Sequence, residues 1–142
     1  MARSHTSFTR SLLSTVIASV IAASAHSADV VINTTVSGHQ EYQSDTTAIT
    51  VTATGSVTAS GSLDDAISLD GSGHALSKIE VLDGGTVSAG WDAIYTGDEG
   101  ANSIGFISIA GDLFSTGYAG GIGVSIDSDT TVNGNVTITS TG

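Results

Sequence analysis

The chain has 142 residues and carries three Lys or Arg against 14 Asp or Glu, for a formal net charge of −11. A chain this acidic lacks the cations that neutralise phosphates, which argues against binding to nucleic acid or anionic lipid. It contains 18 glycines but no cysteine and no proline, so its stability must come from backbone pairing and apolar burial rather than from disulfides. The length allows one domain, or part of a larger one.

The N-terminal segment Met1–Ala25 has the pattern of a secretory signal peptide. Met1–Arg10 carries two arginines and no acid, Leu12–Ala25 is an apolar run, and Ala23-Ser24-Ala25 fits a small-x-small cleavage site. The run is short for a membrane span, which needs about 20 residues. We expect cleavage after Ala25, with a cut after Ala28 as the alternative. The mature chain, residues 26–142, then keeps one lysine and all 14 acids, for a formal charge of −13.

Three kinds of short apolar segment recur along the mature chain at nearly regular intervals. The segments are Val57, Val87 and Leu113 for the first kind, Ala66-Ile67, Ala93-Ile94 and Gly121-Ile122 for the second, and Ile79–Val81, Ile107–Ile109 and Val136–Ile138 for the third. A degenerate earlier copy is present at Val36 and Ala48–Val51. Each kind returns with a period of about 27 residues, and internal repetition at such a period is typical of solenoids.

Apolar residues alternate with small or polar ones inside these segments, which indicates half-buried strands, and no apolar stripe has a helical period. The stretches between them are rich in the turn-forming residues Gly, Asp, Ser and Asn. We therefore predict an all-β parallel β-helix (β-solenoid) with about 27 residues per coil and three short strands in each. The alternative is an antiparallel β-sandwich, whose strand spacing of about 8–12 residues is also met. The likeness of every third strand favours the solenoid.

The signal peptide, the loose GGTVSAG…DAI…ISIAG repeats, the acidic charge and the absence of cysteine together resemble a known class. The chain is similar to the N-terminal passenger segment of Gram-negative autotransporters and of related haemagglutinin-like β-helix surface proteins. The resemblance covers about Val30 to Gly142. It implies export by the Sec machinery, passage through an outer-membrane β-barrel and display at the cell surface or secretion.

The resemblance also implies a role and a boundary. It implies a non-enzymatic stalk or adhesin without a cofactor, whose partner would be a glycan or protein on a host or neighbouring cell. The printed sequence has no barrel and stops inside the repeat pattern, although solenoids need capped ends. We expect residues 26–142 to be passenger repeats truncated before a C-terminal β-barrel. The alternative is a small secreted protein that stacks on another chain.

An enzyme acting on polysaccharide is the competing function, because lyases and glycosidases also use the parallel β-helix. Asp65 and Asp92 precede equivalent Ala-Ile pairs, so we expect them to stack about 5 Å apart on adjacent coils, the separation of a retaining glycosidase pair. Gly120-Gly121 replaces the acid in the next copy, which favours a turn role. Lys78 is the only candidate for a cationic lyase base, and no arginine accompanies it.

The mature chain has three histidines, and none is expected to be catalytic. No G-x-S-x-G turn accompanies His39 or His74, and His26 lies at the new N-terminus without a pattern. We expect His74 to be an exposed turn residue.

Loop acids offer a weak calcium prediction. Asp64-Asp65, Asp98-Glu99 and Asp127-Ser128-Asp129 could share a hard cation if they stack, but no calcium-loop motif is present. We expect no metal site.

Two further patterns lie on the strands or beside them. Trp91 and Tyr118 are one repeat apart, with Leu63 one coil earlier, and we expect a corner stack rather than an aromatic binding strip. Thr50–Thr52 and Thr137–Thr139 have the T-x-T form of ice-binding solenoids. Ser68, Glu80 and Ser108 interrupt that row, so ice binding is not expected.

Overall fold

The computed structural model describes residues 28–69, 73–97, 101–116 and 121–139. Over these residues the chain consists of 14 strands and their connections, with no helix. Each pairing between strands is parallel, which excludes the antiparallel sandwich. Ile79 pairs with Ile107, its counterpart in the next repeat. The predicted β-solenoid, with three short strands in each coil, is therefore confirmed.

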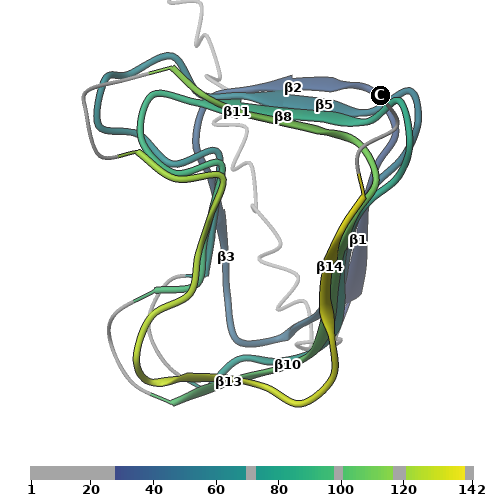
Figure 1. Cartoon of the computed structure of the whole chain (residues 1–142), viewed down its shortest axis with the longest axis vertical. Coiled ribbons are helices and arrows are strands. Elements are labelled where there is room, and N and C mark those ends of the chain that lie inside the picture. Colours follow the sequence, from purple (N-terminus) through teal and green to yellow (C-terminus); the bar gives the residue numbers. More distant parts are fainter. Residues whose placement is uncertain (1–27, 70–72, 98–100, 117–120, 140–142) are drawn as a thin grey trace, which may run out of the picture.

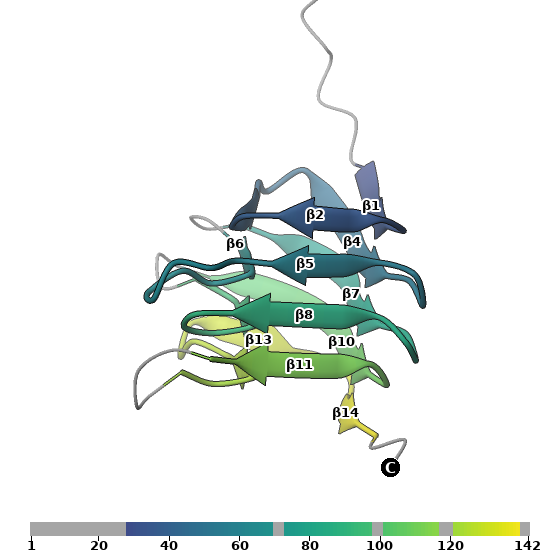
Figure 2. The same cartoon turned by 90° about the horizontal axis from the view of Figure 1, so that it is seen from above.

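Three sheets form the walls of the solenoid (Figure 1), and successive coils stack like rungs (Figure 2). Sheet A contains β1 (Ala28–Ile32), β4 (Thr46–Val51), β7 (Ala75–Val81), β10 (Asn102–Ile109), β13 (Thr130–Val132) and β14 (Val136–Ile138). Sheet B contains β2 (Thr35–Ser37), β5 (Ser56–Thr58), β8 (Thr86–Ala89) and β11 (Asp112–Ser115). Sheet C contains β3 (Gln40–Tyr42), β6 (Ile67–Leu69), β9 (Ile94–Tyr95) and β12 (Val124–Ser125).

Aliphatic columns run along the axis of the solenoid. Ile49, Ile79 and Ile107 are partners in register and are fully buried. The other columns place Val51 on Val81 and Ile109, Val57 on Val87 and Leu113, and Ile67 on Ile94. Burying each such side chain contributes about 1.5–3 kcal/mol, so the columns are the main apolar support of the fold.

Glycine is required at the corner where sheet A passes into sheet B. A Cβ on Gly55 would overlap the carbonyl oxygen of Ile32, and one on Gly85 would crowd that of Thr52. The close approach lets the corners pair between coils, as when Thr86 N donates to Gly55 O at 3.1 Å. The glycines that precede β5 and β8 are therefore packing requirements.

The first coil is shorter than the repeat predicts. Ile32 pairs with Val51, and Val51 pairs with Val81, so the first of these two coils contains far less chain than the second. The reason is that β2 passes to β3 and β3 to β4 through short links, whereas the later coils insert longer loops at both places. Strands β1 and β3 were missed by the repeat pattern, since their spacing to the next copies is not uniform.

The second kind of segment was wrongly aligned in the last copy. Val124, not Ile122, pairs with Ile94, and Ile122 is 53% exposed. The connection before β12 is longer than the one before β9 in the preceding coil, and the register partner of Ile94 lies two positions beyond the one assigned from the sequence. Alternation alone does not separate these two choices, because both keep the period of two.

The predicted signal peptide lies outside the described residues and stays a prediction. Among the described residues, no helix is long and apolar enough to cross a membrane.

Candidate functional site

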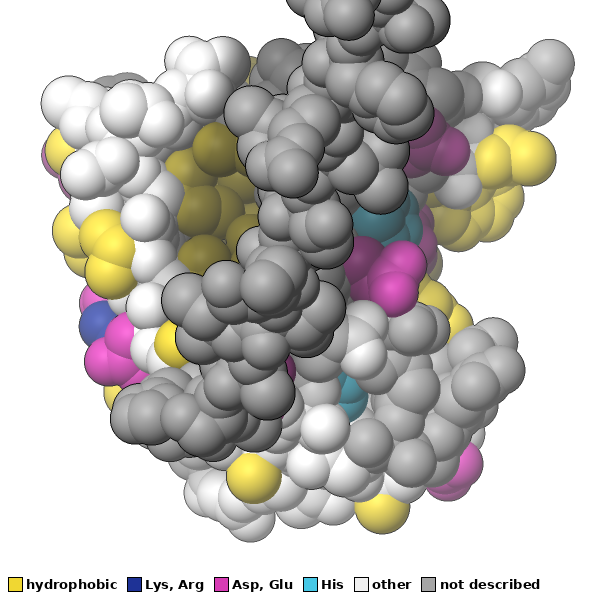
Figure 3. All heavy atoms as spheres, turned by 180° about the vertical axis from the view of Figure 1, so that it is seen from behind, with side chains coloured by type: hydrophobic (Ala, Val, Ile, Leu, Met, Phe, Trp, Pro, Cys, Tyr) yellow, Lys and Arg dark blue, Asp and Glu magenta, His cyan; other side chains and the backbone are white. Residues whose placement is uncertain are grey.

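A polar cluster lies on the outer face of sheet C. Ser68 stands between the inward-facing Ile67 and Leu69 of β6, so its side chain points away from the core, yet it is only 5% exposed. Its Oγ lies 2.8 Å from Nε2 of His39, which belongs to the coil before. Figure 3 shows histidine and acidic side chains adjoining one another on this side of the molecule. Sequence reasoning gave His39 no partner.

Asp65 and Asp92 lie next to each other on adjacent coils, as predicted. The backbone N–H of Asp92 donates to Oδ1 of Asp65 at 3.0 Å, and the N–H of Ile122 donates to Oδ1 of Asp92 at 2.7 Å. Each carboxylate therefore accepts an amide from the next coil. These hydrogen bonds join neighbouring coils, whereas the turn role expected from the sequence would involve one coil alone.

Burial raises the pKa of Asp65 above its ordinary value, and repulsion from Asp92 and Asp64 adds to the rise. The amide hydrogen bond from Asp92 and the nearby His39 oppose it. A carboxyl with a raised pKa is what a general acid requires. Here that carboxyl also holds the backbone of the next coil, which restricts its freedom to serve a substrate.

The cluster contains groups for two kinds of chemistry. Ser68 and His39 meet the distance for a nucleophile and its base, and Asp65 and Asp92 are a close pair of carboxyls. Beside Ser68, backbone amides belong to the parallel ladder with the neighbouring coils, whereas acyl transfer needs amides aimed at an oxyanion. The geometry therefore fits hydrogen bonding between coils better than nucleophilic catalysis.

His74 is buried, with 1% exposure, so the expectation of an exposed turn residue was wrong. Its backbone N–H donates to Oδ1 of Asn102 at 3.1 Å, and its carbonyl accepts from the N–H of Ser103 at 2.8 Å. Nδ2 of Asn102 in turn donates to the carbonyl oxygen of Thr96 at 2.9 Å. Asn102, which sequence reasoning did not consider, thus ties neighbouring loop segments together beneath the surface.

The loop acid Asp127 serves a turn. Oδ1 of Asp127 accepts the backbone N–H of Asp129 at 3.1 Å and the hydroxyl of Ser128 at 3.2 Å. Asp98 and Glu99 lie outside the described residues. Within the described ranges, no group of three or more His, Asp or Glu side chains could hold a metal ion.

The outer face of sheet A carries one mixed row rather than a repeated threonine motif. Thr50, Glu80, Ser108 and Thr137 are register partners on β4, β7, β10 and β14. Nζ of Lys78, the only lysine in the sequence, lies 2.6 Å from Oε2 of Glu80, so the two side chains form an ion pair. Ser68, which was expected to interrupt this row, lies on sheet C instead.

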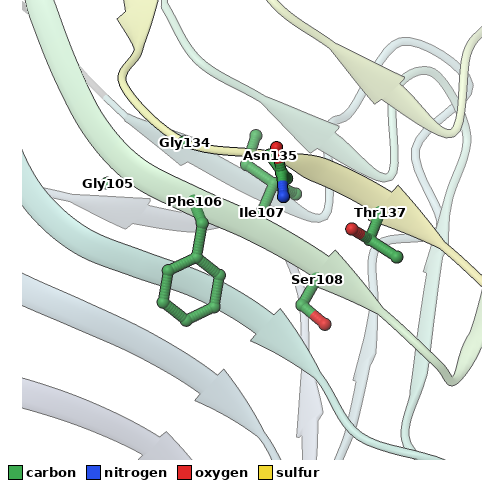
Figure 4. Close-up of a pocket in the computed structure, with 7 residues that line it drawn as sticks. All are labelled: Gly105, Phe106, Ile107, Ser108, Gly134, Asn135 and Thr137. Atoms are coloured by element: carbon green, nitrogen blue, oxygen red, sulfur yellow. The ribbon is translucent and has the colours of Figure 1, made fainter.

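A shallow pocket of about 420 Å³ lies where the last coil leaves β10. Figure 4 shows Phe106 and Ser108 projecting from β10, with Thr137 on β14 and Asn135 nearby. The pocket follows from a mismatch in length, because β10 pairs with β13 at Ile104 and with β14 from Ile107, while the last coil uses an extra residue between them.

The place given to Leu63 in the expected corner stack was wrong. Trp91 is half-buried, and its backbone N–H donates to the carbonyl of Asp64 at 3.0 Å, so Asp64 is its counterpart one coil earlier. Leu63, assigned to that place from the sequence, is 70% exposed. Tyr118 lies outside the described residues.

Comparison with known proteins assigns the chain to no family, so its fold is what classifies it. No protein-family model, curated protein or solved structure matches it. Its class is that of parallel β-solenoids.

Proposed function

We propose that residues 26–142 are part of the passenger of an autotransporter-type or haemagglutinin-like surface protein, acting outside a Gram-negative cell as a non-enzymatic stalk or adhesin. The observation that carries this proposal is the continuous column of Ile49, Ile79 and Ile107, which are buried in register on successive coils. In such a solenoid each coil contacts only its neighbours, so the rod can lengthen without a change of topology. That property suits a stalk that holds a contact surface away from the cell.

Composition supports the same proposal. A chain without cysteine forms no disulfide that would block its passage, still unfolded, through an outer-membrane pore. The stack depends instead on aliphatic burial and parallel pairing, both of which can form after passage. The charge of −13 expected for the mature chain favours a soluble, self-repelling surface.

Export is tested by placing the full chain in front of an outer-membrane β-barrel translocator in a Gram-negative host. We expect surface exposure on intact cells, measured by antibody binding and protease digestion, and a new N-terminus at His26, measured by mass spectrometry. The matched control lacks residues 2–25 and should stay inside the cell. Retention of the uncleaved full chain inside the cell would contradict the proposal.

Adhesion is tested with the same displaying cells. We expect them to bind immobilised glycans or matrix proteins more strongly than cells that display the barrel alone. Equal binding by the two kinds of cell, across a broad panel, would remove the adhesin role and leave the stalk.

One observation favours a polysaccharide-cleaving enzyme as the second candidate: the adjacent carboxyls of Asp65 and Asp92, joined through the Asp92 amide. The test compares sugar release from a panel of polysaccharides by the purified chain and by the Asp65→Asn, Asp92→Asn double variant. Because both asparagines keep the oxygen that accepts the backbone amide, the variant should retain its fold. Cleavage that is present in the parent and lost in a folded double variant would replace the stalk proposal with the enzyme.

A further inference from the structure

The shallow pocket beside β10, here called the β10 pocket, opens on the outer face of sheet A. Phe106 and Ser108 are two residues apart on β10, so both side chains point away from the core. Ser108 pairs in register with Thr137 of β14, and the Phe106 ring is 40% exposed. Figure 4 shows the ring and the Ser108 hydroxyl projecting from the same side of β10. The pocket therefore presents an open aromatic surface next to hydroxyl groups.

A local irregularity of the backbone shapes the β10 pocket. Between the register pairs at Ile104 and Ile107, the last coil uses one residue more than β10. One extra residue in a strand pair bends the strand and re-aims its side chains. A Cβ on Gly134, in the longer segment, would lie 2.5 Å from the carbonyl oxygen of Gly105 and 3.5 Å from Cβ of Phe106. A side chain at Gly134 would therefore crowd the base of the pocket.

The polar side chains of the β10 pocket are available to a ligand. Just outside it, Nδ2 of Asn133 donates to Oγ of Ser103 at 2.9 Å, so this pair is used between coils. Among the described residues, none forms a hydrogen bond with the side chains of Ser108, Asn135 or Thr137. Two hydroxyl groups and one carboxamide can each donate and accept hydrogen bonds. The pocket thus combines one aromatic ring with three polar groups that have capacity to spare.

The charges beside the β10 pocket cancel one another. Lys78 and Glu80 of β7 are register partners of Phe106 and Ser108, so they border the pocket on the side away from β14. These two side chains form an ion pair, and the described residues that line the pocket carry no charge. The whole chain has a formal charge of −11, which disfavours an anionic ligand. An uncharged ligand suits this surface best.

Size and composition together indicate the class of ligand. The volume of about 420 Å³ lies within the range of about 300–1,000 Å³ for pockets that bind small molecules, which combine apolar surface with a few orienting polar groups. A pyranose ring has a C–H face that can pack on an aromatic ring. Its hydroxyl groups lie at the edge, where they can exchange hydrogen bonds with hydroxyl and amide side chains.

We propose that the β10 pocket binds one pyranose unit of a neutral glycan. The sugar packs its C–H face on the ring of Phe106, and its hydroxyl groups bond to Ser108, Asn135 and Thr137. The inference rests on the adhesin role in the proposed function, because it names the ligand for that role. The two can fail separately, since a chain that binds glycans through another surface would keep the adhesin role without this pocket.

Binding is tested by NMR titration of the isotopically labelled, purified chain with neutral oligosaccharides of glucose, galactose, mannose and N-acetylglucosamine. We expect at least one sugar to cause saturable shifts in the amide signals of Gly105, Phe106 and Asn135. A chain with no saturable shift at these amides, for any sugar, would overturn the proposal. Shifts confined to other surfaces would also overturn it, while leaving the adhesin role in place. A uronic acid oligosaccharide that binds as tightly would overturn the choice of a neutral sugar.

The aromatic contact is tested by truncating the ring. Phe106→Ala should weaken sugar binding about tenfold, because it removes the surface on which the sugar packs. The matched control is Phe114→Ala on β11, which removes a ring that is 49% exposed and lies outside the pocket. This control should bind like the parent. Equal affinity of the two variants for the sugar would overturn the proposal.

A second pair of variants tests the hydrogen bonds with little risk to the fold. Thr137→Val replaces a hydroxyl with a methyl group of similar size on an exposed residue, and it should weaken sugar binding about threefold. Thr131→Val is the matched control, since Thr131 is exposed on β13 of the same sheet and lies outside the pocket. Equal binding by these two variants would mean that the sugar does not contact β14, and would overturn the proposal.

Discussion

Strands β7 and β14 carry the same pattern of aliphatic residues in the same columns, yet they differ sharply in burial. Ile79 and Val81 of β7 are fully buried between neighbouring coils, whereas Val136 and Ile138 of β14 are largely exposed. The strands share one register through β10. For this pair of strands, burial is therefore set by the coils on either side and not by the strand's own sequence.

This contrast explains how the solenoid divides its stability. Each coil contributes its own backbone order and one interface with the next coil, so stability is close to a sum of neighbouring terms. An interior side chain takes part in two interfaces and an end side chain in one. The same substitution should therefore have different costs along a single column.

The largest effect is expected from truncating the interior column. Ile79→Ala should lower the free energy of unfolding by about 2–5 kcal/mol, because it leaves a cavity among fully buried neighbours. Ile138→Ala, one column away on the exposed strand β14, should change it by about 0.5 kcal/mol or less. Urea unfolding followed by the fluorescence of Trp91 measures both. Equal losses of unfolding free energy in the two variants would contradict the expectation that an interior side chain stabilises the stack more than an exposed one.

A smaller effect is expected where backbones of adjacent coils approach closely. A Cβ on Gly105 of β10 would overlap the carbonyl oxygen of Ser77 on β7, so Gly105→Ala should cost about 1–3 kcal/mol by forcing the two strands apart. Gly123→Ala is the matched control, since its Cβ would lie 3.7 Å from the nearest atom of Leu113, an ordinary contact. The same urea experiment compares the free energies of unfolding of the two variants. A Gly105→Ala chain as stable as Gly123→Ala would mean that β7 and β10 can move apart without strain.

The columns could be predicted from the sequence because they repeat. Ile79, Ile107 and Val136 stand at nearly equal intervals, and aliphatic side chains of similar shape occupy each position. The position of Val124 could not be predicted, because Ile122 and Val124 both fit the apolar alternation and the length of the loop before β12 differs from that of the coil before. Loop length is free to vary in a solenoid as long as the strands return to register.

Only those members of the polar cluster that are spaced by the repeat period could be predicted from the sequence. Asp65 and Asp92 each precede an Ala-Ile pair, so their adjacency followed from the spacing. The contact between Ser68 and His39 depends on the short first coil, whose spacing differs from the rest, and so it left no periodic signal. His74 was placed wrongly because its glycine-rich surroundings indicate a turn, while the Asn102 contact that holds its backbone comes from the next coil.

The smallest expected effect concerns the hydrogen bond between adjacent coils that the Asp92 amide donates to Asp65. Burial raises the folded-state pKa of Asp65 above its ordinary value of 3.8, so the folded chain binds more protons at this carboxyl than the unfolded chain. Stability from this group is therefore fully present below pH 3.8 and is lost as the pH rises through the raised folded pKa. Asp65→Asn stays neutral and still accepts the Asp92 amide. The stability of this variant relative to the parent should therefore increase across that pH window and then level off, in urea unfolding measured at a series of pH values. A variant that becomes less stable than the parent as the pH rises would mean that the hydrogen bond from the Asp92 amide to the charged Asp65 outweighs the cost of burying that charge. The polar contact between these coils would then depend on charge, whereas the aliphatic columns depend on packing.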